Sequence, residues 1–192
     1  MNLRNILIAI ATGASLFLGG GAAAGELVAE KSDIRFISVK NASFAEVHRF
    51  GSLSGSITGD SVLVTIPLVD VQTRIPIRNE RMREMLFNTD LYPKATLTAD
   101  VDMAKIMALQ SGEYADMDVA FVLDLHGSSR TLNAAVSVAR LGDEIHVSTL
   151  APLVLNARDF ELTAGIEKLR EVAGLSNINT AVPVTARLVF SR

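Results

Sequence analysis

IRNERMREMLF, residues 77–87, is a helical stretch in the middle of a chain that otherwise alternates like β-strands. Met82, Met85 and Leu86 recur at i, i+3 and i+4, a spacing that places them on one face of a helix. A tyrosine-proline pair follows at 92–93, and ATLTADV at 95–101 then alternates with the period of two that is typical of a half-buried strand. The stretch therefore predicts one short helix over residues 79–88, inserted between strands.

Working outward, alternating apolar residues and flanking turn residues predict about eight strands and a second helix. The helix is expected over residues 165–173, followed by Gly174 as its C-terminal cap. The strands are expected near residues 27–39, 46–57, 62–68, 94–103, 117–125, 130–140, 144–150 and 181–190.

Short turns make neighbouring strands of this chain antiparallel. Gly59-Asp60, Gly127-Ser128 and Gly142-Asp143 each fit a tight connection between two predicted strands. Because an all-β chain must dispose of its sheet edges, and full closure removes them, eight such strands favour a barrel. Periodicity alone leaves a two-sheet sandwich open, and an eight-stranded barrel can be either filled by side chains or hollow.

The first 24 residues have the order of a secretory signal peptide. Arg4 precedes an apolar run from Ile6 to Leu18, and small residues follow up to Ala24. The run is short for a membrane span, and its end suits a signal peptidase, although an uncleaved N-terminal anchor is the alternative. We therefore expect a signal peptide at 1–24, a single domain at 25–192, a periplasmic or secreted location, and no stable membrane anchor after cleavage.

Charge and composition exclude several functions. Of the 18 basic and 21 acidic residues only Arg4 lies in the signal segment, so the net charge changes from −3 to −4 on its removal. This weak acidity argues against a nucleic-acid partner, which requires a clustered basic face. The absence of cysteine excludes a disulfide framework, a thiol nucleophile and thiolate metal sites.

No catalytic or metal-binding motif is present. The chain lacks a nucleophile elbow, a phosphate-binding glycine loop and the zinc pattern His-Glu-x-x-His. His48, His126 and His146 stand far apart, without the spacing of metal ligands. The sequence thus predicts no metal, no cofactor and no enzyme, although distant carboxylates can still meet inside a barrel.

Several segments together resemble the YceI-like family, a lipocalin-like family that binds polyisoprenoids and other lipids. They are the opening strand 32–41, the glycine-marked segment 51–57, the segment 67–73 that leads into the helix, the arginine-aspartate-phenylalanine element at 158–160 and the late helix at 165–174. The resemblance covers nearly all of residues 25–192. Asn79 and Arg81 depart from it, because many relatives carry aspartate and histidine there, and so does Asn41, which replaces a common histidine.

The resemblance implies an eight-stranded antiparallel lipocalin-like barrel that sequesters or carries an amphipathic lipid. The ligand it implies is of the polyisoprenoid type, with quinone and fatty-acyl lipids as alternatives, and it also implies pairing into a homodimer. Three other readings stay open at this point. They are a quinone-binding accessory of respiratory electron transfer, a barrel-cavity enzyme acting on a hydrophobic substrate, and a partner-binding barrel packed solid.

Candidate ligand-contacting residues follow from strand alternation and the helix stripe. Arginine forms forked hydrogen bonds with phosphate or carboxylate, and Arg78 is the candidate for a lipid headgroup because it precedes the predicted helix rather than lying along it. The alternatives are a solvated helix face for the arginines and a core-facing plug for the methionines. The expected apolar wall is Ile34, Phe36, Val64, Ile66, Met82, Met85, Leu86, Phe121, Leu123, Val136, Val138, Phe160 and Phe190.

Overall fold

An antiparallel sheet that closes on itself forms the body of the molecule. In this computed structural model, which describes residues 24–192, strand β1 (Ala24–Leu27) pairs with both β4 (Ser54–Thr58) and β12 (Ala181–Ser191). The closed order is β1-β4-β5-β7-β8-β9-β10-β12, which makes an eight-stranded barrel. The predicted fold is confirmed, and the predicted signal peptide lies outside the described residues apart from Ala24.

The remaining strands have these bounds: β2 (Asp33–Lys40), β3 (Phe44–Phe50), β5 (Ser61–Pro67), β6 (Val71–Gln72), β7 (Lys94–Asp100), β8 (Tyr114–Leu125), β9 (Ser128–Leu141), β10 (Glu144–Thr149) and β11 (Leu153–Asn156). The helices are α1 (Pro76–Arg81), α2 (Met103–Met107) and α3 (Thr163–Val172). A π-helical segment, η3 (Met82–Phe87), continues α1, and short 3₁₀ turns lie at η1 (Ala29–Lys31), η2 (Leu68–Asp70) and η4 (Ala157–Phe160). Within residues 24–192, none of the helices has the combined length and apolarity of a membrane span.

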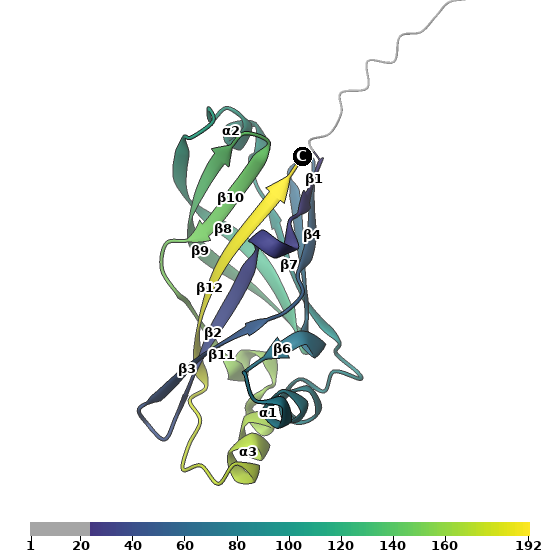
Figure 1. Cartoon of the computed structure of the whole chain (residues 1–192), viewed down its shortest axis with the longest axis vertical. Coiled ribbons are helices and arrows are strands. Elements are labelled where there is room, and N and C mark those ends of the chain that lie inside the picture. The colour runs from purple at the N-terminus through teal and green to yellow at the C-terminus, as the bar shows by residue number, and fades with distance from the viewer. Residues whose placement is uncertain (1–23) are drawn as a thin grey trace, which may run out of the picture.

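The helices close the two ends of the barrel. Figure 1 shows an elongated barrel with α2 at one end and α1 and α3 together at the other. The first helix begins at Pro76, three residues before its predicted start, because proline is preorganised for the first helical position, where its missing N–H costs nothing. The helical stretch ends at Asn88, which adopts a left-handed conformation with φ 47°.

Two strands of the barrel are interrupted rather than continuous. The predicted strand 27–39 is divided into β1 and β2 by η1, and both halves pair with the same side of β12. The predicted strand 46–57 is divided in the same way into β3 and β4. The breaks let the wall bend, so the barrel closes around its interior without a continuous ladder.

Tyr92, which follows the helix, packs over the β8–β9 hairpin turn. The β8–β9 turn consists of His126 and Gly127, with φ 53° and 76°, one residue earlier than predicted. Both values are positive, as a two-residue type I′ turn requires. The Tyr92 ring lies 4.5 Å from the His126 ring, and a Cβ at Gly127 would lie only 2.9 Å from Tyr92 Cε1. Glycine is therefore required here for both φ and space.

Candidate functional site

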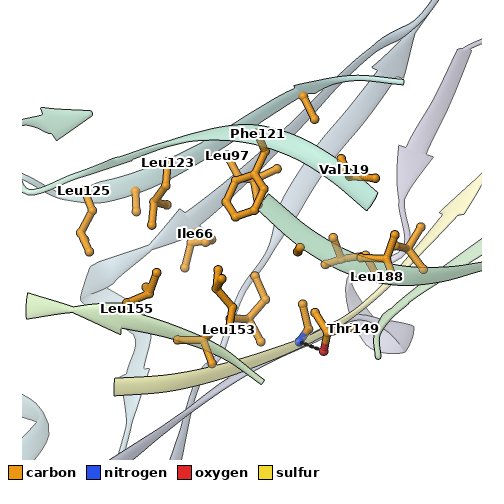
Figure 2. A pocket seen from close by; sticks show the side chains of 18 of the residues that line it. Ile66, Leu97, Val119, Phe121, Leu123, Leu125, Thr149, Leu153, Leu155 and Leu188 are labelled. Carbon is orange, nitrogen blue, oxygen red and sulfur yellow. Dashed lines mark hydrogen bonds between the residues drawn. The ribbon is translucent and has the colours of Figure 1, made fainter. Parts of the chain in front are cut away.

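A cavity of about 280 Å³ runs through the barrel interior. It extends from Met103 and Ile106 of α2 at one end to Leu86 of η3 and Ile166 of α3 at the other. Figure 2 shows Val119, Phe121, Leu123 and Leu125 of β8 facing Leu153 and Leu155 of β11 across this space. The wall is made of alternate residues on most strands, because successive side chains of a strand point to opposite faces.

The cavity wall is almost entirely apolar. Thr149 carries the polar side chain among the residues that line it. The Thr149 Oγ1 atom accepts a hydrogen bond of 3.2 Å from the backbone N–H of Ala186, so this oxygen already has a structural partner (Figure 2). No side chain that ionises near neutral pH lines the cavity in the described part of the chain. Such a space favours hydrocarbon over water or charged groups.

A row of aromatic rings lines the helix end of the cavity. Phe36 of β2 and Phe50 of β3 have ring centroids 5.4 Å apart, and Phe50 lies 6.1 Å from Phe87 of η3. All three line the cavity. The spacings fit tilted aromatic contacts, and the row connects the strands to η3.

Beyond the aromatic row, the inward face of β2 and β3 becomes polar. The ring of His48 lies 5.2 Å from Phe36, and its Nε2 atom lies 2.9 Å from Ser38 Oγ. Further along, Glu46 Oε2 lies 2.5 Å from Lys40 Nζ. We call Ser38, Lys40, Glu46, His48 and Arg78 the polar cluster.

Arg78 connects this cluster to the first helix. Its Nη1 atom donates to Glu46 Oε2 at 2.8 Å, and its Nη2 atom donates to the Thr73 backbone oxygen at 2.5 Å. Thr73 is held in turn by Asn79, whose Oδ1 atom accepts from the Thr73 backbone N–H at 2.8 Å and from its hydroxyl at 2.6 Å. Asn79 is thus a structural residue that fixes the start of α1.

The polar cluster perturbs two titrating groups. The hydrogen bond from Lys40, and then the nearby Arg78, lower the pKa of Glu46 despite some burial. Burial and then the positive charge of Arg78 lower the pKa of His48 to about 4. At neutral pH the cluster therefore holds a carboxylate, two cations and a neutral imidazole.

Most of the predicted wall residues do line the cavity. Their alternation placed them on the inward face of the strands, and Leu86 reaches the cavity from η3. The predicted residues that line it are Ile34, Phe36, Ile66, Leu86, Phe121, Leu123, Val136, Val138, Phe160 and Phe190. Their contact with a ligand stays a prediction.

Two methionines of the predicted stripe do not line the cavity. The prediction assumed α-helical spacing, but residues 82–87 form a π-helix, whose wider i to i+5 turn places residues four and five apart on one face. The buried residues of this segment are accordingly Met82 and Phe87, and it is Leu86 and Phe87 that reach the cavity. Met82 belongs to the packed core, and Met85 is half-buried outside the cavity wall.

Val64 and Arg78 also lie off the cavity wall. Val64 is on the inward face of β5, but its exposed fraction is 0 %, so other side chains cover it completely. Arg78 was expected to precede the helix, whereas it lies within α1 and pairs with Glu46 in the polar cluster. It is thus near the helix end of the barrel and not inside the apolar space.

Sequence reasoning missed several lining residues. Leu153 and Leu155 belong to β11, a four-residue strand that was not predicted, although they alternate around Val154 directly after Pro152. Met103 and Ile106 of α2 are spaced i, i+3 behind Asp102, whose side chain caps the helix by accepting from the Lys105 N–H at 3.0 Å. Each of these two patterns spans only a few residues, so neither by itself predicts a strand or a helix from the sequence.

Metal ligands are not gathered anywhere in the described chain. Among residues 24–192, no group of three or more histidine, aspartate or glutamate side chains lies close enough together to hold a metal ion. The polar cluster contains one carboxylate and one imidazole, and both are next to cations.

Comparison with known proteins identifies relatives of this barrel. The chain is 40 % identical to a polyisoprenoid-binding domain from Saccharophagus degradans implicated in plant cell wall breakdown, with a TM-score of 0.86 over 88 % of this chain and 98 % of that one. BcnA of Burkholderia cenocepacia shares the fold, with 17 % identity and a TM-score of 0.63 over 83 % of this chain and 96 % of its own. No curated protein sequence matches. Because the YceI-like domain model matches residues 26–190, the chain belongs to the YceI-like family.

Proposed function

We propose that this protein binds a polyisoprenoid-type lipid in its barrel, with the apolar tail in the cavity. The observation that carries the proposal is the cavity itself, about 280 Å³ of space that extends between the two barrel ends and is lined by hydrocarbon side chains and one threonine. Kinship with the polyisoprenoid-binding domain of Saccharophagus degradans supports the same ligand class. Among residues 24–192 the cavity wall carries one hydroxyl group and no acidic or basic side chain, which supports the proposal of binding rather than catalysis.

The affinity would come from burial of the tail. Each methylene transferred from water into an apolar site contributes about 0.8 kcal/mol, so a few isoprene units suffice for tight binding without polar contacts. Apolar contact discriminates poorly between chains of similar width. Selectivity for the tail is therefore expected to be modest.

The polar cluster is the place we propose for the headgroup. It follows the apolar cavity along the same face of β2 and β3, beyond Phe36. Arg78 Nε and His48 Nδ1 are buried and have no hydrogen-bond partner within residues 24–192. Buried polar atoms without partners are costly, so an oxygen-rich headgroup that reached them would gain hydrogen bonds.

We further propose that the protein is exported and acts as a carrier. The support is the basic, apolar and small-residue order of residues 1–24, which has the features of a cleavable signal. A lipid with a long tail needs a protein shield to cross an aqueous compartment, and a closed apolar barrel provides one.

Native mass spectrometry of the protein purified from its own host tests the proposal. We expect a bound species that solvent extraction releases and that fragments as a prenol, a prenyl phosphate or another isoprenoid. A quinone would identify the electron-transfer alternative, and a fatty acid would replace the proposed ligand class. A protein that carries nothing and takes up no labelled prenol, quinone or fatty acid would contradict lipid binding altogether.

A further inference from the structure

The segment Arg74-Ile75-Pro76-Ile77 exposes two large aliphatic side chains at the helix end of the barrel. Ile75 is 44 % exposed and Ile77 is 51 % exposed. Single exposed aliphatic residues are normal, but here two lie within one turn of chain, with the ring of Pro76 exposed between them. The segment leads directly into α1, at the end of the barrel shown at the bottom of Figure 1.

The backbone of this segment is held in an uncommon conformation. Arg74 has a φ of 64°, in the left-handed region that residues other than glycine, asparagine and aspartate rarely adopt. Two hydrogen bonds tie the preceding residue, Thr73, to α1, one from Thr73 N–H to Asn79 Oδ1 and one from Arg78 Nη2 to Thr73 O. Backbone strain persists only where the surrounding structure holds it, and such strained residues cluster at functional sites.

Positive charge surrounds the exposed isoleucines. Between residues 74 and 84 four arginines and two glutamates give a charge of +2, in a chain whose net charge is −3. Within the described residues, the side chains of Arg74, Arg81 and Arg83 have no carboxylate oxygen within 4 Å. Arg83 Nη1 lies 3.5 Å from the Val69 backbone oxygen, which is an uncharged partner. The three guanidinium charges therefore lack a carboxylate among these residues and can act on a partner.

The segment 74–77 lies at the helix end of the cavity. α1 continues without a break into η3, whose Leu86 and Phe87 line the cavity. Arg78 joins α1 to β3 through Glu46, and Phe44, 62 % exposed, lies two residues along β3 from Glu46. Exposed apolar residues among unpaired arginines have the composition of a segment that lies in a membrane interface.

We infer that this end of the barrel docks on a bilayer that contains anionic lipids. Ile75 and Ile77 enter the boundary between headgroups and acyl chains, and Arg74, Arg81 and Arg83 meet the lipid phosphates. The charge complementarity selects a membrane over another apolar partner. The inference depends on the proposed function only for its purpose, which is to bring the helix end of the cavity to a source of lipid.

Flotation with vesicles tests the inference without any barrel ligand. Vesicles of phosphatidylcholine with phosphatidylglycerol should bind the protein at low salt, whereas pure phosphatidylcholine vesicles should bind it weakly. The double variant Ile75→Ser, Ile77→Ser should lower partitioning about tenfold, because two half-exposed aliphatic side chains no longer insert. Ile75 stands at the N-cap of α1, a position that favours serine, so the helix of the variant is expected to remain folded.

Two further variants separate the apolar and the ionic parts. Arg81→Gln should lower binding about fivefold and weaken its dependence on salt. The matched control is Leu141→Ser at the opposite end of the barrel, and it should bind like the unchanged protein. Leu141 is 48 % exposed, and the neighbouring Arg140 Nη1 donates to the backbone oxygen of Met107 in α2 at 3.1 Å. Circular dichroism checks that each variant is folded.

Three results would overturn the inference. They are equal binding to anionic and neutral vesicles, full binding by the folded Ile75→Ser, Ile77→Ser variant, and a dimer in sedimentation velocity that this variant dissociates without any vesicle binding. Lipid extraction from the same preparations tests the proposed function, independently of the flotation result. Vesicle docking by a protein that carries no barrel lipid would contradict the proposed function and leave the docking surface in place.

Discussion

At the scale of single residues, His48 is the buried titratable group that couples folding to pH. It is 4 % exposed and packs against Phe36, one step beyond the cavity wall. Burial, and after it the charge of Arg78, lower its pKa from 6.5 to about 4, while Glu46 opposes the shift and Lys40 and Arg74 add to it. The folded protein therefore keeps this imidazole neutral at a pH where the unfolded chain protonates it.

We predict that stability falls as the pH is lowered from 6.5 to 5. Over this range the unfolded state binds more protons at His48 than the folded state, so the free energy of unfolding decreases with decreasing pH. The expected loss is about 1 kcal/mol, less than the full shift would give, since solvent screens part of the polar cluster. Urea unfolding at pH 6.5 and pH 5 measures it. Glu46 contributes little over this range, because its pKa is 4.5 in the unfolded chain and lower in the folded protein.

His48→Gln is the control for this prediction. Glutamine keeps a side-chain hydrogen-bonding group for Ser38 but does not titrate. The variant should lose most of the pH dependence between 6.5 and 5, whatever its absolute stability. If the slope of the unchanged protein survives in this variant, a group other than His48 causes it.

At the scale of elements, the sequence predicted the strands but not the places where they break. Alternation reports which face a residue points to, and it continues across a kink, so residues 27–39 and 46–57 each read as one strand. The breaks depend on side chains from elsewhere in the chain. Ser32 Oγ, for example, donates to Val28 O at 2.8 Å and accepts from Val189 N–H at 3.0 Å, which joins β12 to the chain at η1. No local pattern distinguishes such a serine.

The helix shows the same limit. Its existence followed from the apolar spacing, but the switch from α1 to a π-helix did not, because a π-helix is stabilised by tertiary packing rather than by a local signal. This is why Met82 and Met85 were assigned to the cavity and Phe87 was not. The barrel interior was predictable from strand alternation, and its two ends were not.

The Thr149 hydroxyl supplies a hydrogen-bond acceptor where the backbone pairing of β12 is interrupted between β10 and β11. Pairing with β10 ends at Ser148 and pairing with β11 begins at Leu153, and in the gap the Ala186 N–H donates to Thr149 Oγ1 at 3.2 Å. We predict that Thr149→Val lowers the free energy of unfolding by about 1–3 kcal/mol, because a backbone N–H loses its acceptor. Thr149→Ser keeps the oxygen and should cost less, while both variants should retain bound lipid. Loss of lipid in a stable Thr149→Val variant would instead assign this hydroxyl to the ligand.

Gly165 sets the contact between the two helical elements at the barrel end. A Cβ on Gly165 of α3 would lie 2.6 Å from Met85 O and 2.7 Å from Leu86 Cα, both backbone atoms of η3. We predict that Gly165→Ala destabilises the protein by about 1–3 kcal/mol, since α3 and η3 must move apart. Chemical unfolding measures this, and it opposes the gain of about 1 kcal/mol that alanine gives in an unconstrained helix. A stabilised Gly165→Ala variant would show that the contact yields easily.

At the scale of the whole molecule, the cavity lowers the free energy of unfolding, and the requirements of folding alone do not explain why it is present. At about 24 cal/mol per Å³, 280 Å³ of apolar space would lower stability by about 7 kcal/mol, relative to an interior packed with side chains, if nothing occupied it. Protein interiors are otherwise packed like organic crystals. A barrel selected only for stability would fill this space, so the cavity itself indicates selection for an occupant.

If the cavity lowers stability and makes room for a ligand, filling it should raise stability and exclude the ligand. Ala134 of β9 lines the cavity and is the cross-strand partner of Val119 in β8. Ala134→Phe should place a ring in the cavity. We expect the free energy of unfolding to rise by about 1–2 kcal/mol, while lipid recovered by extraction falls to about a tenth or less of the unchanged protein's content. Ala135→Phe is the matched control, because neighbouring side chains on a strand point to opposite faces and Ala135 is exposed. It should leave lipid content unchanged, and equal loss in both variants would mean that the lipid does not occupy the barrel.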